Sequence, residues 1–149
     1  MAAWWFYHLE RSRPELAAAP LIEKCLERDW RVLAVSPSER RRAELDEALW
    51  TFADGSFLPH GRSDGDGEAG RQPVLISPTL DNANGAKAAL LFDGGEAPPD
   101  APFERCMVMF EDGDAPVRAV ARAQFKAAKD AGLEVRYFQQ AGRGWKERT

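Results

Sequence analysis

The sequence contains little of what stabilises small secreted or metal-bound proteins. Only two of its 149 residues are cysteines, and Cys25 and Cys106 lie 81 positions apart with no CxxC pair. Two such thiols exclude a framework of several disulfides and argue against a structural zinc site. We therefore expect inert core thiols in a reducing cytosol, with no metal site and no bound cofactor.

Long apolar segments are also missing from the start of the chain. The run Trp4–Tyr7 is followed by His8 and Glu10. A run of this length is too short for a signal peptide or a membrane span. We therefore expect a cytoplasmic protein that does not enter a membrane.

Sequence motifs for catalysis are scarce. The serine-hydrolase GxSxG and zinc-protease HExxH patterns are missing, and the glycine-rich stretch 61–71 lacks the GKS or GKT of a phosphate-binding loop. We predict that this stretch is a mobile loop and that His8, inside a strand, is structural. We expect no catalytic residue, although an acid–base pair or metal site assembled in space stays open.

Charge is distributed unevenly. The formal net charge is −4, but residues 116–149 carry +5 and the remainder carries −9. An acidic chain with a basic C-terminal quarter favours a localised anion site. A general duplex-DNA binder would normally be basic overall.

The hydrophobic pattern alternates between strands and helices. The expected strands are Trp4–Leu9, Arg31–Val35, Val74–Ser77, Ala88–Phe92, Arg105–Phe110 and Leu133–Phe138. The expected helices cover residues 14–28, 37–50 and 116–131. This order predicts a single α/β domain over residues 1–149, with three layers, a mostly parallel sheet and helices on both faces. We also expect strands 4–9 and 31–35 to be neighbours, because one helix joins them.

Helix boundaries are suggested by capping residues. The spacing of Ser12 and Glu15 is that of a capping box, and Pro20 is expected to kink the first helix or delay its start. Ser36 is the expected cap of the second helix, with Pro37 at its first position. Gly132 is expected to end the third helix, and residues 142–149 to form a tail.

The third helix carries the most informative pattern. Its basic residues, Arg118, Arg122, Lys126 and Lys129, fall within one narrow stripe at 100° per residue. Phe125 lies on the seam between this stripe and the apolar face. An aromatic ring beside a basic stripe suits an acidic ligand with an apolar group. The alternative is a solvated basic face with Phe125 in the core.

A second constellation is aromatic. Trp50 points about 140° away from the core residue Leu45 on its helix. The segment that follows contains Phe57, Pro59 and His60. Exposed aromatic residues cluster at protein interfaces, so we predict that Trp50 and Phe57 form a partly exposed patch. The alternative is that Phe57 folds into the core.

These residues carry a family resemblance. The segment LDEALW at 45–50, followed by SFLPH at 56–60, is specific, and weaker matches occur at 6–9, 31–33, 73–76 and 121–126. Over almost its whole length the chain resembles the chi subunit of bacterial DNA polymerase III holoenzyme. The resemblance implies a Rossmann-like α/β fold.

The resemblance also implies a function. Chi-like proteins are non-catalytic accessory subunits of a nucleotidyltransferase complex in DNA replication. They bridge the clamp loader, through the small psi subunit, to the acidic, phenylalanine-ending tail of single-stranded DNA-binding protein, so DNA contact is mainly indirect. The implied tail-binding residues are Arg118, Arg122, Phe125, Lys126 and Lys129. The implied psi-binding residues are Trp50, Phe57, Pro59 and His60.

A hypothesis from a different class remains. An α/β domain of this size can also bind a small molecule or nucleotide, or descend from an enzyme. That alternative predicts a closed pocket and a metabolite carried through purification. The adaptor predicts binding of an acidic peptide with a free terminal carboxylate.

Overall fold

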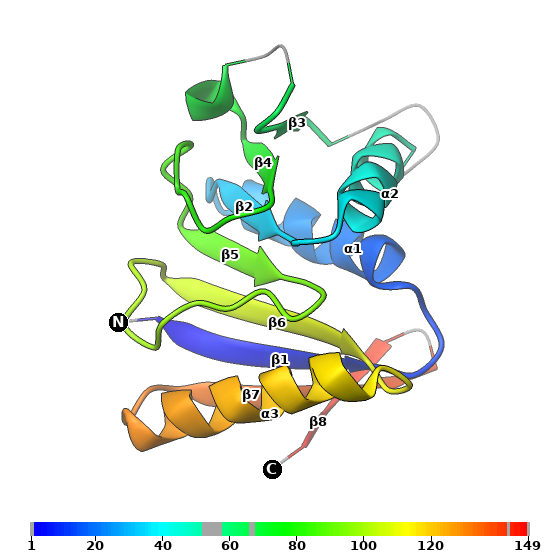
Figure 1. The fold of residues 1–149 in the computed structure, drawn as a ribbon, viewed down its shortest axis with the longest axis vertical. Helices are drawn as coiled ribbons and strands as arrows, with labels where there is room; N and C mark the ends of the chain where they lie inside the picture. Colours follow the sequence, from blue (N-terminus) through cyan, green and yellow to red (C-terminus); the bar gives the residue numbers. More distant parts are fainter. Residues whose placement is uncertain (1, 52–57, 66–67, 143, 149) are drawn as a thin grey trace.

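The computed structural model contains one sheet flanked by helices (Figure 1), and it describes residues 2–51, 58–65, 68–142 and 144–148. Its strands are β1 (Ala3–Leu9), β2 (Val32–Val35), β3 (Gly61–Arg62), β4 (Val74–Ser77), β5 (Ala88–Leu91), β6 (Arg105–Glu111), β7 (Val135–Ala141) and β8 (Gly144–Arg148). Its helices are α1 (Pro14–Glu27), α2 (Glu39–Trp50) and α3 (Ala115–Asp130), with a 3-10 turn over Ala69–Arg71.

The strands form one eight-stranded sheet in the order β3-β4-β2-β5-β6-β1-β7-β8. All neighbouring pairs are parallel except β7 and β8. The predicted mostly parallel α/β fold is therefore confirmed. The expected adjacency of β1 and β2 is wrong, because β5 and β6 lie between them. Both intervening strands are apolar on both faces, and such strands gain most from interior positions.

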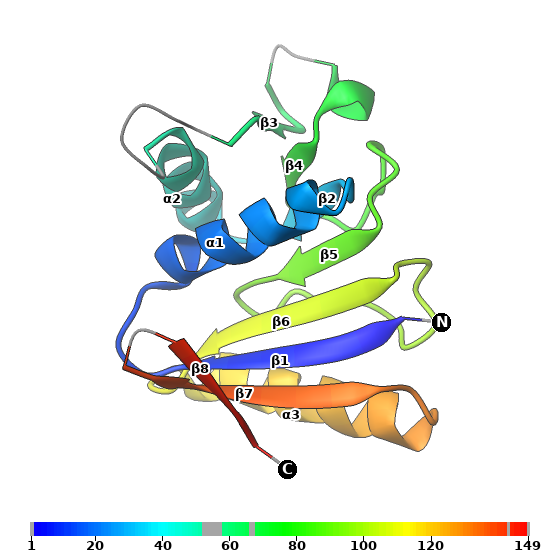
Figure 2. The same ribbon diagram turned by 180° about the vertical axis from the view of Figure 1, so that it is seen from behind.

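Helices cover both faces of the sheet, which confirms the three layers. Figure 1 shows α3 across β1 and β7, and the reverse view in Figure 2 shows α1 and α2 on the other face. Each face has its own apolar cluster. Ile22 and Leu45 pack on the α1 and α2 side, while Phe6 and Ala121 pack on the α3 side.

Strand alternation assigns side chains to these two faces. Along β1, Trp4 and Phe6 belong to the α3 side, whereas Tyr7 and Leu9 belong to the α1 side. Successive side chains of a strand point to opposite faces. One strand therefore supplies residues to two separate surfaces.

The predicted caps of the first two helices are corrected by the structure. Arg13, not Ser12, precedes α1 and makes no side-chain cap, and the hydroxyl of Ser12 instead accepts a hydrogen bond from Gln140. The helix starts at Pro14 and continues through Pro20, so the delayed start is also wrong. Ser38 caps α2 by accepting a hydrogen bond from the Arg41 amide.

Ser36 has a different role from the predicted cap. Its hydroxyl donates to Asp93 at 2.6 Å and accepts from the Ser38 amide at 3.1 Å. The predictions for Ser12 and Ser36 were wrong for the same reason. The hydroxyl of a serine at capping spacing can form its hydrogen bond equally well with a residue far away in the sequence. The predicted end of α3 is confirmed, and its N-terminal cap is revealed by the structure. Asp114 accepts from the Val117 amide, and Gly132, with φ +76°, follows the last turn.

Two segments expected to be irregular contain regular structure. Residues 144–148 of the predicted tail form β8, which pairs antiparallel with β7. The glycine-rich stretch contributes β3 and the 3-10 turn. The sequence GDGEAG at 65–70 has the GxGxxG spacing of a dinucleotide-binding motif. Its last glycine, Gly70, lies in a turn that leads into β4 rather than into a helix. That context differs from the strand–turn–helix which the fingerprint requires.

A buried ion network ties the helices to the sheet. The Arg41 side chain is 6% exposed, and its guanidinium contacts Glu15 at 2.5 Å, Asp93 at 3.1 Å and Glu111 at 3.2 Å. Glu15 comes from α1, Asp93 follows β5, and Glu111 ends β6. Three elements are thus fixed around one cation of α2.

The described residues contain neither a helix able to span a membrane nor a cluster of metal ligands. None of the described helices combines the length and apolarity that crossing a membrane requires. Within the same residues, no group of three or more His, Cys, Asp or Glu side chains is placed to hold a metal ion. Cys25 and Cys106 are buried and unpaired, and burial raises the pKa of Cys106 to about 12.

Candidate functional site

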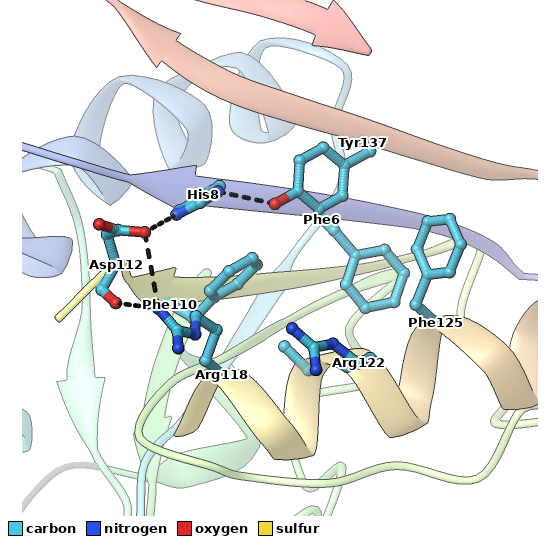
Figure 3. Close-up of a pocket in the computed structure, with 9 residues that line it drawn as sticks. Phe6, His8, Phe110, Asp112, Arg118, Arg122, Phe125 and Tyr137 are labelled. Atoms are coloured by element: carbon cyan, nitrogen blue, oxygen red, sulfur yellow. Dashed lines mark hydrogen bonds and ion pairs between the residues drawn. The ribbon is translucent and has the colours of Figure 1, made fainter. Parts of the chain in front are cut away.

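A pocket of about 410 Å³ opens between α3 and the carboxyl ends of β1 and β6. Figure 3 shows its lining side chains converging from these strands, from β7 and from the first turns of α3. The lining residues are Phe6, His8, Phe110, Asp112, Arg118, Ala121, Arg122, Phe125 and Tyr137.

Parallel register aligns the strand residues of the pocket. Phe6 pairs with Tyr137 of β7, and His8 pairs with Phe110 of β6. All four side chains therefore point to the face that α3 covers. Along the helix, Arg118, Ala121, Arg122 and Phe125 recur at the spacing of one helical face.

A chain of polar contacts crosses one end of the pocket. The Tyr137 hydroxyl lies 2.7 Å from Nδ1 of His8, and Nε2 of His8 lies 2.7 Å from an Asp112 carboxylate oxygen. Arg118 donates to the carbonyl of Asp112 at 2.8 Å. Burial, with the Asp112 charge nearby, raises the pKa of Tyr137, so its hydroxyl stays neutral. These contacts fix the His8 ring against the α3 N-terminal turn.

Aromatic rings form the pocket floor. The Phe125 ring meets Phe6 edge-on at 5.3 Å between centroids and Tyr137 at 6.2 Å. His8 stacks on Phe110 at 4.9 Å. Aromatic walls of this kind suit a flat apolar group, and their offset and edge contacts hold the floor rigid.

Arginines form the rim. Arg122 makes no ion pair with any residue that the structure describes, and Arg118 lies 3.8 Å from the Asp112 carboxylate while remaining 42% exposed. A guanidinium presents its donors in a planar fork that matches a carboxylate. The arrangement can therefore bind a ligand that combines negative charge with an aromatic or apolar end.

The structure separates the five residues predicted on α3. Arg118, Arg122 and Phe125 line the pocket, whereas Lys126 and Lys129 do not. Lys126 pairs with Asp130 at 2.7 Å, and the Lys129 ammonium lies 5.9 Å from the Phe125 ring centroid. Phe125 combines both sequence interpretations, because it packs on the core and also faces the pocket.

The second predicted constellation lies at the end of α2. Trp50 is 55% exposed, as its helical position predicts, and its ring meets His60 edge-on at 5.4 Å. His60 is held by the Leu58 carbonyl at 2.6 Å and by Asp46 at 2.7 Å. Pro59 is exposed. Phe57 lies outside the described residues.

Besides Phe6 and Ala121, four pocket residues were not predicted as site residues, namely His8, Phe110, Asp112 and Tyr137. They come from three segments, and only the sheet brings them together. Alternation in β1 places His8 on the Phe6 face, which is the one signal that could have found it. Strand register and strand order bring the other three residues to the pocket, and the sequence pattern shows neither.

Fold and pocket together define an α/β protein with a mostly parallel sheet and a ligand-sized, arginine-rimmed aromatic pocket at its strand ends. A family model described as "DNA polymerase III chi subunit, HolC" matches residues 1–136. The chain therefore belongs to the DNA polymerase III chi subunit family, a family of DNA replication proteins.

Two relatives are similar to this chain. One, a "Probable DNA polymerase III subunit chi" of Rickettsia prowazekii, is 29% identical over 91 residues, which cover 61% of this chain and 54% of that protein. The other, a "DNA polymerase III subunit chi" of Pseudomonas aeruginosa, is 30% identical over 132 residues, which cover 85% of this chain and 89% of that protein. The chain thus spans about half the length of the first relative and most of the second.

Proposed function

We propose that this chain is a non-catalytic accessory subunit of the DNA polymerase III holoenzyme. In this role it links the replicase to the acidic C-terminal tail of single-stranded DNA-binding protein. The observation that carries the proposal is the aromatic pocket with Arg118 and Arg122 at its rim. Membership of the chi family supplies the replication context.

The pocket supports a defined binding mode. The terminal phenylalanine of the tail would lie on the floor formed by Phe6, Phe125 and Tyr137. Its free carboxylate would meet Arg122, whose guanidinium makes no ion pair with a described residue. Upstream acidic residues would lie along Lys126 and Lys129. Helix α3 would therefore bind the end of the tail in the pocket and the acidic residues that precede it along the basic stripe.

The expected interaction free energies suit a reversible contact. Each charge pair at such an exposed rim contributes roughly 1 kcal/mol or less. A well-buried aromatic end group contributes roughly 2 kcal/mol. Electrostatic steering accelerates the encounter and weakens as salt rises. An adaptor that must release its partner needs this combination.

A second surface would join the subunit to the clamp loader. We assign psi binding, where psi is present, to Trp50, Phe57, Pro59 and His60. Support comes from the 55% exposure of Trp50, an unusual value for a tryptophan in an otherwise well-buried fold. Exposed aromatic residues of this kind are common anchors of protein interfaces. This surface lies on α2 and the pocket on α3, so both partners can bind at once.

The test is a peptide titration. An acidic peptide that ends in phenylalanine with a free carboxylate should bind the full chain. The amidated peptide and a peptide ending in alanine should bind more weakly, because each lacks one half of the anchor. Arg122→Ala should reduce binding, whereas Arg40→Ala, an exposed arginine of α2, should not. Equal binding of all three peptides, or equal loss in both variants, would refute the proposal.

The same titration separates the alternative function. A small-molecule or nucleotide domain would carry a ligand through purification, which native mass spectrometry detects as added mass. Such a ligand, displaced by nucleotide but not by the peptide, would favour that alternative. The open, arginine-rimmed form of the pocket favours the peptide.

A further inference from the structure

A second concave surface lies on the opposite side of the sheet. Two adjoining cavities, of about 530 Å³ and 170 Å³, share Leu21, Lys24 and Trp145 and together form one groove. The groove runs between α1 and the β7–β8 hairpin. Figure 2 shows this hairpin on the viewer's side, below α1. It is separated from the α3 pocket by the whole thickness of the sheet.

The groove lining is basic. Arg11, Arg13, Lys24 and Arg105 contribute to it, and no Asp or Glu lines either cavity among the described residues. Arg13 is neutralised by Glu15 at 3.1 Å. The other three cations make no ion pair within the part of the chain that the structure describes. This local excess occurs in a chain whose net charge is −4.

Arg105 is the most unusual of these cations. Its guanidinium lies 3.6 Å from the centroid of the Trp5 ring and 5.1 Å from that of Trp30. Burial lowers the pKa of this guanidinium, although it remains charged. Tryptophan faces attract cations through the ring quadrupole. The rings hold the guanidinium in place while leaving its hydrogen-bond donors for a ligand.

Aromatic side chains form the floor of the groove. Trp5 meets Phe138 at 5.5 Å between centroids, Phe138 stacks on Tyr7 at 5.1 Å, and Trp145 meets Tyr7 edge-on at 5.1 Å. Trp5, Phe138 and Trp145 are each partly exposed. The Arg136 guanidinium also lies over the Trp5 and Phe138 rings, at 4.8 Å and 5.4 Å from their centroids. The floor therefore combines partly exposed ring surface, Trp145 included, with stacked cations.

The acidic groups nearby are already engaged. Glu134 accepts a hydrogen bond from the Trp5 indole at 3.1 Å. Glu147 pairs with Arg136 at 2.6 Å. Neither carboxylate lines the groove. The charge of Glu147 is offset by Arg136, whereas the Glu134 carboxylate acts electrostatically on both Arg105 and Arg136.

We propose that this groove binds a short stretch of single-stranded nucleic acid directly. Partly exposed aromatic rings stack with unpaired bases of any sequence, and neighbouring cations neutralise the backbone phosphates. A duplex would keep its bases away from the floor. The groove and the α3 pocket lie on opposite faces of the sheet, so either binding proposal can be refuted without affecting the other.

The test uses the full chain and fluorescently labelled oligothymidine of about eight nucleotides, within the range that single-strand grooves accommodate. Anisotropy should rise at low salt, and tryptophan emission should be quenched by the stacked bases. With three unpaired cations, log K should fall with log salt at a slope of about −2. A matching duplex should bind more weakly, because its paired bases cannot stack on the floor.

Variants localise the binding. The double variant Arg11→Ala/Lys24→Ala removes two exposed side chains and should weaken binding about tenfold without unfolding the protein. Trp145→Leu should weaken binding and reduce the quenching. Arg122→Ala, on the opposite face, and Arg40→Ala serve as matched controls and should bind as wild type does.

Three results would overturn the proposal. The first is no binding of the single strand at low salt. The second is equal affinity of the double variant and the Arg122→Ala control, which would place any binding elsewhere. The third is displacement of the oligonucleotide by an acidic peptide from the wild type but not from Arg122→Ala, which would assign the signal to the α3 pocket.

Discussion

The hydroxyl of Tyr137 and Nδ1 of His8 lie 2.7 Å apart, although 129 positions separate the two residues in the sequence. The pairing of β1 with β7 makes this contact, and the contact orients the ring that stacks on Phe110. The floor of the pocket is thus assembled by strand order.

Removing this hydroxyl should loosen the pocket. Tyr137→Phe leaves His8 with Asp112 as its remaining partner at 2.7 Å. A lost hydrogen bond of this type costs about 1 kcal/mol, so we expect a two- to fivefold weaker affinity for the acidic peptide. Isothermal titration measures it. Tyr7→Phe, the same change on the opposite sheet face, should leave peptide affinity unchanged; equal effects would contradict a role for the His8 contact.

The basic residues of α3 should contribute unequally to peptide binding. Arg122→Ala should weaken the peptide about tenfold, which corresponds to ~1.4 kcal/mol. Lys126→Ala should weaken it only two- to threefold, because its ammonium pairs with Asp130 and lies outside the pocket. Titrations at two salt concentrations check both, and both effects should shrink at high salt. A larger loss for Lys126→Ala would move the anchor away from the pocket.

The buried cation of α2 should dominate stability. Arg41→Ala would leave the Glu15 carboxylate, 1% exposed, without its 2.5 Å partner. Breaking a buried pair costs about 3–5 kcal/mol, and urea unfolding should show a loss of that size. The matched variant Arg40→Ala changes a 77% exposed side chain one position earlier. It should change stability by about 0.5 kcal/mol or less.

Acid should destabilise the protein through Glu15. Burial opposes its ionisation, but its backbone hydrogen bond, the contact with Glu44 and the charge of Arg41 outweigh burial and lower its pKa from 4.5. A carboxyl with a lowered folded pKa contributes stability above its unfolded pKa and loses it as the pH falls through the folded value. Glu15→Gln should therefore be less stable than wild type at pH 7, and the difference should shrink below about pH 4. A constant difference across this range would contradict the assignment.

The exposed ring of α2 should matter for association and little for folding. Trp50→Ser removes a side chain that is 55% exposed. We expect a small change in unfolding free energy and a loss of psi binding, or of self-association where psi is missing. Light scattering and a pull-down with psi measure these effects. A loss of stability above about 2 kcal/mol would instead show that Trp50 belongs to the core.

Local features of the sequence determined the helices, most of the strands and the helical part of the site. β4 occupies the predicted residues 74–77, and Gly132 follows the end of α3 as expected. These outcomes depend on hydrophobic period and capping, which act over a few residues. The same period brought Arg118, Arg122 and Phe125 onto one helical face. The resemblance of segments such as Leu45–Trp50 predicted the family, and the family model that matches residues 1–136 confirms it.

Tertiary structure alone decided the strand order and the part of the site that the sheet contributes. β5 and β6 separate β1 from β2 because strand order depends on which faces must be buried, and no local pattern encodes that choice. Ser12 and Ser36 bond Gln140 and Asp93 instead of capping their helices, since a hydroxyl takes whichever partner folding brings nearest. The same long-range pairing placed His8 beside Tyr137 and Arg105 over Trp5. Those contacts join residues about a hundred positions apart, and only the completed sheet holds them together.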